Sequence, residues 1–248
     1  MLEVQDVVKH FDGNLAVNRV SFRIDKGELT ALIGPNAAGK TTLLDIISGF
    51  TAQDEGMVRL NGVDLGRLSP WRRARSHITR TFQHLRDIKA LTCLQNVQLR
   101  VRGQIGNGLI SAIVGRGVWR KQEQAVADRA RQILAGLRME DLTQKPTSTL
   151  SFGQRKMLCL AGALAHDGDL FLLDEPVSGL DPKRREIVAE ALISLAAKGK
   201  HVLFVEHNLQ LVTLVAQRVL ALDRGCIVAE GDPKSVLASS AVIRAYTQ

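Results

Sequence analysis

The sequence predicts an α/β fold, with a mixed, mainly parallel sheet, an N-terminal antiparallel β subdomain and a helical insertion. The 248 residues suffice for a buried core, and 45% apolar with 23% charged residues is an ordinary globular composition, which excludes disordered, collagen-like and disulfide-stapled chains. Short apolar runs alternate with segments of helical periodicity, as in parallel sheets that helices cover on both faces. The expected central strands are 29–33, 170–173 and 202–205.

The first elements are expected to be strands, followed by a glycine-rich loop and a helix. The strands and the turns between them are predicted at 2–11, Asp12-Gly13-Asn14, 17–24, Lys26-Gly27 and 29–33. The loop runs from Gly34 to Gly39. A helix is predicted after it because apolar residues recur at i, i+3 and i+4.

The remaining elements follow from the same periodicities. A strand near 78–82 is expected among short helices from 72 to 102, before a glycine-rich loop at 103–117. Later elements are helices at 122–136 and 152–166, a strand at 170–174, a helix at 182–198, a strand at 201–205, a helix at 209–216 and a strand pair over 218–230. We expect one domain, with a core at about 1–83 and 166–248 and a helical subdomain at about 84–165.

The segment Gly34-Pro-Asn-Ala-Ala-Gly-Lys40-Thr41 fits the phosphate-loop pattern G-x-x-x-x-G-K-[ST]. Backbone N–H groups and the following helix N-terminus would face phosphates, Lys40 would reach the β- and γ-phosphate oxygens, and Thr41 would place its hydroxyl on Mg²⁺. The residues expected to contact the nucleotide are Gly34, Pro35, Asn36, Ala37, Ala38, Gly39, Lys40, Thr41 and Thr42. The flanking strand and helix favour a P-loop NTPase core over a plain glycine turn.

An acidic pair ends the apolar run Leu170-Phe-Leu-Leu-Asp174-Glu175. A phosphate loop needs an acid for its metal at the end of a neighbouring strand, and Asp174 would hold Mg²⁺ directly or through water. Glu175 would accept a proton from the attacking water. The competing interpretation is a pair of solvated residues at a strand end.

The charge of the chain is concentrated in its middle. The chain has 33 basic and 25 acidic residues, a net charge of +8. Between Arg67 and Lys121 there are 12 basic residues and the single acid Asp87, so this segment carries +11 and the rest of the chain −3. A basic segment favours a partner with negative charge, and a solvated face without a partner is the alternative.

Cysteines and hydropathy constrain the location. Cys93, Cys159 and Cys226 are too few and too scattered for a disulfide framework or a zinc site, so we expect reduced, cytosolic thiols. The acidic N-terminus lacks the features of a secretory signal, and no window approaches 18 apolar residues. We therefore expect a protein that does not span a membrane by itself.

Several motifs together resemble a known family, the ATP-binding cassette (ABC) ATPases. Leu150-Ser151-Phe152-Gly153-Gln154 is similar to the family's signature sequence, and Glu175-Pro176-Val-Ser178-Gly-Leu-Asp181-Pro182 to the loop after its acidic pair. Val205-Glu206-His207-Asn208 resembles the switch-histidine region and Thr81-Phe82-Gln83 the Gln loop. Phe11 falls where an aromatic ring stacks on adenine, although a core aromatic is the alternative.

The resemblance implies a head-to-tail dimer that sandwiches two ATP molecules, each site completed in trans. Ser151, Gly153 and Gln154 would contact the γ-phosphate bound by the second subunit, and Asp181 would contact its phosphate loop. His207 would hydrogen-bond the γ-phosphate, and Gln83 would sense Mg²⁺ or the attacking water. Taken alone, Gln83 and His207 would be interpreted as ordinary polar residues, and only their order relative to the stronger motifs favours these roles.

Three positions depart from the family pattern. Ala37 and Phe152 stand where the family commonly has glycine, and Gly162 replaces a common arginine. If position 37 needs a positive φ, alanine costs on the order of 1 kcal/mol there. No catalytic group is lost, and the effect on ATP affinity and turnover stays open.

A narrower resemblance is to the ATPase subunits of branched-chain amino-acid importers. It rests on Ile47-Ser-Gly-Phe50, Thr79-Arg-Thr-Phe-Gln83, Leu91-Thr-Cys-Leu-Gln-Asn-Val97, the glycine-rich insertion through Arg120 and Val242-Ile-Arg-Ala-Tyr246. ATPases for urea uptake and lipopolysaccharide export share parts of this pattern.

The resemblance implies an ATP-hydrolysing subunit that dimerises with itself or a paralogue and drives a separate integral membrane permease, indirectly with a solute-binding protein. It would lie peripherally on the cytoplasmic face of the inner (plasma) membrane, where the basic segment would face the permease and anionic lipid. The alternative is a soluble ABC ATPase that acts on nucleic acid or in cofactor assembly, but neither heptads nor paired cysteines support it. The sequence does not name the solute, the direction of transport or the second ATPase subunit.

Overall fold

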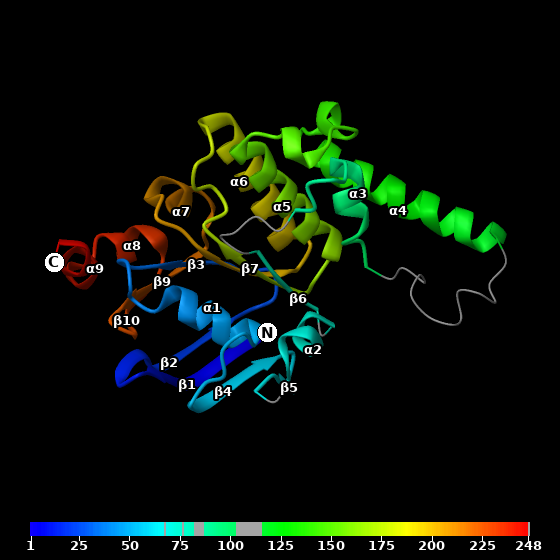
Figure 1. Cartoon of the computed structure of the whole chain (residues 1–248). Coiled ribbons are helices and arrows are strands. Elements are labelled where there is room, and N and C mark those ends of the chain that lie inside the picture. Colours follow the sequence, from blue (N-terminus) through cyan, green and yellow to red (C-terminus); the bar gives the residue numbers. More distant parts are fainter. Residues whose placement is uncertain (67, 76, 82–86, 103–115, 248) are drawn as a thin grey trace. The chain divides into compact units, whose positions relative to one another are not determined.

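The computed structural model describes residues 1–66, 68–75, 77–81, 87–102 and 116–247, without the side chains of 116–120 (Figure 1). The chain divides into two compact units, which are described separately. The sheet unit contains Met1–Gln83, Gly168–Ser178 and Ala189–Gln248. The helical unit contains His84–Asp167 and Gly179–Val188. The predicted α/β class is confirmed, with a mixed sheet and an antiparallel N-terminal sheet.

The smaller sheet of the sheet unit is antiparallel, in the order β2-β1-β4-β5. Its strands are β1 (Leu2–Phe11), β2 (Asn14–Ile24), β4 (Glu55–Leu60) and β5 (Val63–Asp64). The strand β2 begins three residues earlier than the predicted 17, because Phe11 pairs with Asn14 across a two-residue turn. Asp12 and Gly13 in that turn both have positive φ, as hairpins of this length require.

The larger sheet has the order β10-β9-β3-β8-β7-β6 and is parallel except at β10. Its strands are β3 (Leu29–Ile33), β6 (Ile78–Arg80), β7 (Leu170–Asp174), β8 (His201–Val205), β9 (Arg218–Asp223) and β10 (Cys226–Gly231). Every residue of β3, β7 and β8 is buried, which agrees with the prediction that these are the central strands.

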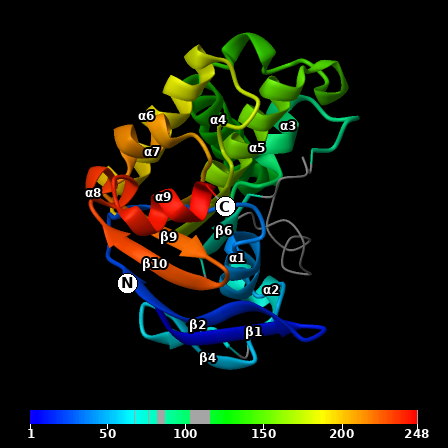
Figure 2. The same ribbon diagram turned by 90° about the vertical axis from the view of Figure 1, so that its left-hand side faces the viewer.

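Short helices complete the sheet unit. They are α1 (Lys40–Ser48), α2 (Pro70–Arg75), α7 (Leu209–Val215), α8 (Pro233–Leu237) and α9 (Ser240–Thr247). The last two were not predicted from the sequence, and they contact β9 and β10, as Figure 2 shows. The helix α6 (Pro182–Ala197) begins in the helical unit and ends in the sheet unit.

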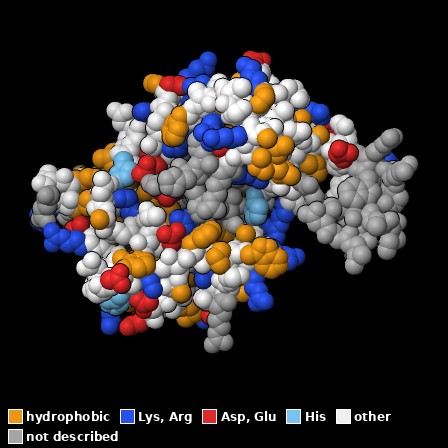
Figure 3. Space-filling view, in the orientation of Figure 1, with side chains coloured by type: hydrophobic (Ala, Val, Ile, Leu, Met, Phe, Trp, Pro, Cys, Tyr) orange, Lys and Arg blue, Asp and Glu red, His pale blue; other side chains and the backbone are white. Residues whose placement is uncertain are grey.

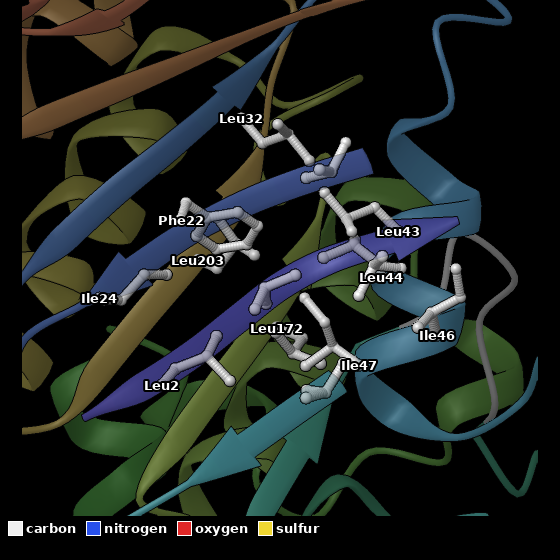
Figure 4. Packing of buried hydrophobic residues seen from close by; sticks show 14 of the residues in the cluster. Leu2, Phe22, Ile24, Leu32, Leu43, Leu44, Ile46, Ile47, Leu172 and Leu203 are labelled. Atoms are coloured by element: carbon white, nitrogen blue, oxygen red, sulfur yellow. The ribbon is translucent and has the colours of Figure 1, made fainter. Parts of the chain in front are cut away.

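The core of the sheet unit is built around α1. Its side chains Leu43, Leu44, Ile46 and Ile47 are fully buried and lie between the two sheets (Figure 4). They belong to one cluster with Leu2 of β1, Ile24 of β2, Leu172 of β7 and Leu203 of β8. Burial of such a side chain contributes about 1.5–3 kcal/mol. The packing therefore fixes the helix that begins directly after the glycine-rich loop.

The helical unit contains α3 (Cys93–Gln98), α4 (Arg116–Gly136) and α5 (Phe152–His166), which contact one another pairwise. Two 3₁₀ turns, Glu140–Leu142 and Thr147–Thr149, connect α4 to α5. The helix α4 begins six residues before the predicted 122, and the rest of the predicted glycine-rich loop lies outside the described residues. Among the described helices, none combines the length and the apolar character needed to cross a bilayer.

Candidate functional site

The glycine-rich loop follows β3 and leads directly into α1. Gly34 has φ +151°, and a Cβ atom there would lie 2.1 Å from the carbonyl oxygen of Leu222. Gly39 has φ +101°, and a Cβ atom there would lie 2.4 Å from the carbonyl oxygen of Ala16. Both positions therefore require glycine for space as well as for conformation. The loop packs tightly between β2 and β9.

The first sequence departure lies in this loop and is strained. Ala37 has φ +62°, in the left-handed region, so the condition for a strain of about 1 kcal/mol is met. The other two departures lie in the helical unit. A Cβ atom on Gly162 would lie 2.4 Å from Cδ of Arg100, so glycine leaves room for that side chain. Phe152 is 57% exposed at the first position of α5.

Lys40 is buried at the start of α1, with 7% of its surface exposed. Its Nζ donates hydrogen bonds to the carbonyl oxygens of Gly34 and Pro35, both at 2.7 Å. Burial lowers the pKa of Lys40, while the negative charges of Glu175 and Asp174 oppose that change. The ammonium group is therefore held inside the loop, in the field of the acidic pair.

The acidic pair lies at the end of β7, next to the end of β8. Asp174 is buried, and its backbone N–H donates to Oγ1 of Thr81 at 3.1 Å. Glu175 has φ +47° and donates its N–H to the carbonyl oxygen of Val205 at 2.9 Å. A left-handed non-glycine residue stores strain that surrounding contacts must maintain, and such residues cluster at functional sites. His207 follows β8, and its Nε2 lies 3.2 Å from Oε1 of Glu175.

These groups line one open pocket of about 330 Å³ in the sheet unit. The carboxyl ends of the parallel strands β3, β7 and β8 meet at this edge of the sheet, where α/β proteins bind ligands. The lining residues are Ala16, Asn36, Ala37, Ala38, Gly39, Lys40, Thr41, Thr42, Asp174, Glu175, Val205 and His207. The structure thus brings the phosphate loop, the acidic pair and the histidine together, as the motifs predict.

A divalent cation fits the oxygen donors of this pocket. Thr41 and Asp174 both line it, and Mg²⁺ prefers oxygen ligands such as their hydroxyl and carboxylate groups. Within the described ranges, no three His, Cys, Asp or Glu side chains form a metal centre of their own. Phosphate oxygens and water would therefore have to complete the coordination shell.

Phe11, Gly34 and Pro35 are predicted nucleotide-binding residues that do not line this pocket. Phe11 ends β1 and is 45% exposed, with Nζ of Lys9 5.4 Å from the centre of its ring. Gln83 lies outside the described residues, so its predicted role stays a prediction.

The residues expected to act in trans belong to the helical unit, and all of them except Gly153 form capping hydrogen bonds at helix N-termini. Oγ of Ser151 accepts from the N–H of Gln154 at 3.3 Å, and Oε1 of Gln154 accepts from the N–H of Ser151 at 2.9 Å. This capping box begins α5, with Gly153 in its first turn. Asp181 precedes α6, and hydrogen bonds from the backbone and side chain of Arg184 lower the pKa of its carboxyl.

Glu206 is a site residue whose role the sequence did not reveal. It is 2% exposed, and its carboxylate accepts backbone N–H groups of Val177 at 2.8 Å, His207 at 3.2 Å and Asn208 at 3.4 Å. The side chain therefore joins the loop after Glu175 to the segment that carries His207. The available signal was a carboxylate directly after the apolar run 202–205 of β8.

Two arginines of the basic segment are also structural. Arg73 is 2% exposed, and its guanidinium donates to the carbonyl oxygens of Leu68, Ile46 and Ile47. The side chain of Arg80 is 6% exposed and forms an ion pair with Asp45 of α1. The expectation that Arg73 belongs to a surface patch is wrong, because its side chain turns inward to the C-terminal carbonyls of α1.

Comparisons with known proteins agree with the motifs. The family model described as ABC transporter matches residues 17–178. The chain is 34% identical over 246 residues to a probable branched-chain amino acid transport ATP-binding protein LivG of Archaeoglobus fulgidus, covering 99% of this chain and 95% of the relative.

Two solved structures show the same fold. The ADP conformation of MJ1267, an ATP-binding cassette of an ABC transporter, matches with a TM-score of 0.83 and 29% identity, covering 100% of this chain and 98% of the other. The dimeric structure of MJ0796, a bacterial ABC transporter cassette, matches with a TM-score of 0.79 and 26% identity, covering 94% and 99%.

Proposed function

The chain belongs to the ABC transporter family and is an ATPase, and we propose that it is the ATP-hydrolysing subunit of an importer for branched-chain amino acids. The single observation behind the catalytic part is the pocket in which a phosphate loop faces an acidic pair and a histidine. The choice of solute is supported by the likeness to LivG, which extends over 99% of the chain.

The pocket would bind ATP through its phosphates. Backbone N–H groups of the loop would surround the phosphate oxygens, and Lys40 would leave the carbonyls of Gly34 and Pro35 to bind the β- and γ-phosphates. Phe11 would stack on adenine. Thr41, Asp174 and Gln83 would hold Mg²⁺, which neutralises negative charge on the phosphate oxygens.

Hydrolysis would depend on the two side chains at the other wall of the pocket. Glu175 would orient the attacking water and accept its proton, and His207 would donate a hydrogen bond to the γ-phosphate. Their contact at 3.2 Å supports these roles, because it puts the base and the phosphate-binding group beside the same reaction centre. The hydrogen bond from the N–H of Glu175 to Val205 holds this residue at the strand end despite its strained backbone.

We propose that the complete site forms between two copies or paralogues. Ser151, Gly153 and Gln154 of one subunit would bind the γ-phosphate held by the other, and Asp181 would contact its phosphate loop. The match to a cassette with a dimeric structure supports this arrangement. ATP would then join the subunits, and hydrolysis would release them.

The permease is proposed to bind the surface formed by Phe50, Trp71, Arg72 and Arg75, here named the α2 surface. Phe50 is 49% and Trp71 is 64% exposed, and Cζ of Arg75 lies 4.7 Å from the Trp71 ring centre. In Figure 3, hydrophobic and basic side chains gather over α2. Exposed aromatic and arginine side chains are enriched at protein interfaces. This surface would place the subunit peripherally at the cytoplasmic face of the inner membrane.

The catalytic proposal is tested with Glu175→Gln. The amide cannot take a proton from water, so hydrolysis should fall at least about 100-fold while ATP binding persists and the dimer accumulates. The matched control is Glu123→Gln on the exposed face of α4, which should hydrolyse ATP like the wild type. Hydrolysis by Glu175→Gln near the wild-type rate would show that another group is the base.

The solute is tested by uptake in cells that lack this chain. Uptake of labelled leucine should be lost, should return with the wild-type chain and should not return with Glu175→Gln. Uptake of an unrelated sugar serves as the control. Normal leucine uptake in the deletion strain would reject the solute assignment without affecting the assignment as an ATPase.

A further inference from the structure

A side chain of the helix α9 forms a hydrogen bond with the phosphate loop. Oη of Tyr246 in α9 accepts a hydrogen bond from the backbone N–H of Gly34 at 2.8 Å. The helix is held in place because Val242 is buried and α9 contacts both β10 and α8. Tyr246 is the only tyrosine of the chain. A residue at the end of the sequence therefore bonds the first residue of the loop.

Gly34 lies where its N–H needs a protein partner. The residue is buried and closely packed, since a Cβ atom there would lie 2.1 Å from the carbonyl oxygen of Leu222. A buried N–H that lacks an acceptor is strongly unfavourable. Tyr246 supplies that acceptor. The far end of the loop is fixed separately, because Gly225 donates its N–H to the carbonyl oxygen of Ala38 at 3.0 Å.

Both polar groups of Gly34 are bound by side chains in this structure. Tyr246 takes the N–H, and Nζ of Lys40 donates to the carbonyl oxygen at 2.7 Å. The two contacts would respond differently to the binding of phosphates. Lys40 would have to leave the carbonyl to reach the phosphates, whereas Tyr246 can remain. Once phosphates are bound, Tyr246 would be the side chain that still holds Gly34, the first residue of the loop.

We propose that Tyr246 is a positioning residue that preorganises the phosphate loop for nucleotide binding. The inference rests on the proposed function, since it requires a nucleotide at the loop. The hydroxyl acts here as a neutral acceptor, because burial raises the pKa of Tyr246 above its usual value. When Lys40 moves to the phosphates, a loop without the Tyr246 bond must order its first residue during binding, and that ordering weakens affinity.

The test is Tyr246→Phe, which removes only Oη and keeps the ring. Calorimetric dissociation constants for ADP and steady-state KM for ATP should rise about three- to tenfold, the range expected for one lost hydrogen bond, while kcat stays within about twofold. The rise in Tm produced by a fixed ADP concentration should shrink accordingly. Deuterium uptake in a peptide that contains Gly34 should increase.

The matched control is Ile243→Ala, on the same helix and 52% exposed, which keeps Oη and should bind ADP like the wild type. A lower Tm for Tyr246→Phe with unchanged ADP affinity and KM would overturn the proposal in favour of a merely structural role. A fall in kcat at constant KM would also overturn it. Absence of nucleotide binding by the wild type would instead reject the proposed function.

Discussion

Replacing Ala37 by glycine should stabilise the protein although it removes a methyl group. Ala37 is exposed at φ +62°, so its side chain contributes little burial while its backbone is strained. A left-handed conformation costs an L-residue about 1–2 kcal/mol, and glycine escapes this cost. Glycine also increases the conformational entropy of the unfolded chain, which opposes the stabilisation by about 0.4–1 kcal/mol. The net stabilisation is about 0.5–1 kcal/mol.

For a chain of this length, that free energy corresponds to an increase in Tm of about 1–4 °C, measured by thermal unfolding of Ala37→Gly without nucleotide. Ala38→Gly is the matched control, because Ala38 is next in the same loop, is buried and lies outside the left-handed region. That control loses a buried methyl group and gains unfolded-state entropy, so its Tm should fall. The reasoning is refuted if Ala37→Gly lowers Tm, or if both variants shift Tm in the same direction.

Three further predictions concern side chains outside the phosphate loop. In Glu206→Gln, an NH₂ group takes the place of one carboxylate oxygen, so the side chain can no longer accept all of the backbone N–H groups that Glu206 binds. The kcat for ATP hydrolysis should therefore fall about tenfold, while the ATP dissociation constant stays within twofold. An unchanged kcat would contradict the positioning role. Arg73→Met keeps the side-chain volume but removes the donor that the carbonyl oxygens of Leu68 and Ile47 bind, so the free energy of unfolding should fall by about 2–4 kcal/mol in thermal melting. The exposed control Arg72→Met should melt like the wild type. Hydrogen bonds from the Lys9 side chain and a backbone N–H lower the pKa of Asp54 to about 2, so Asp54→Asn should lower Tm above about pH 4, and the difference from the wild type should vanish as the pH falls through 2; a difference that does not depend on pH would exclude the ionised carboxylate as its cause.

The elements that agree with the sequence prediction are those with a strong apolar pattern. The strands β3, β7 and β8 each have four apolar residues out of five, and α1 has four apolar side chains at helical spacing. A strand that is buried on both faces is apolar along its length, and a helix that is buried on one face has apolar residues at helical spacing. The helices α8 and α9 have only five and eight residues, too few for periodicity to predict a helix, and such short helices are held by tertiary contacts.

Within the site, the sequence indicates which groups do chemistry but not which groups hold them. Lys40, Asp174 and Glu175 are identified because their motifs are local in the chain. The partners Tyr246 and Glu206 act across long separations, 212 residues for the bond to Gly34 and 29 for the bond to Val177. No local pattern encodes such a pairing, since one acceptor of suitable length can occur anywhere that the fold returns to the loop.

Net charge along the sequence is likewise an incomplete guide to surface charge. The segment from Arg67 to Lys121 carries +11, but Arg73 binds carbonyls inside the protein and Arg80 is paired with Asp45. A guanidinium at a helix C-terminus neutralises the negative end of the helix dipole and satisfies carbonyls that lack a partner within the helix. Arg73 therefore stabilises the helix that begins at the phosphate loop. The surface available to a permease is smaller than the segment's charge indicates.

The capping roles of Ser151 and Gln154 are compatible with their proposed action on a second subunit. Both capping bonds use acceptor oxygens, Oγ of Ser151 and Oε1 of Gln154, so neither uses the hydroxyl hydrogen or the amide hydrogens. Those donors stand at the N-terminus of α5, where the helix dipole favours an anion. Asp181 differs because its ionised carboxylate only accepts hydrogen bonds and would repel a phosphate. Its proposed contact is therefore with backbone N–H groups of the partner's loop, and Asp181→Asn should weaken ATP-dependent dimerisation, measured by light scattering, without changing ATP binding to the monomer.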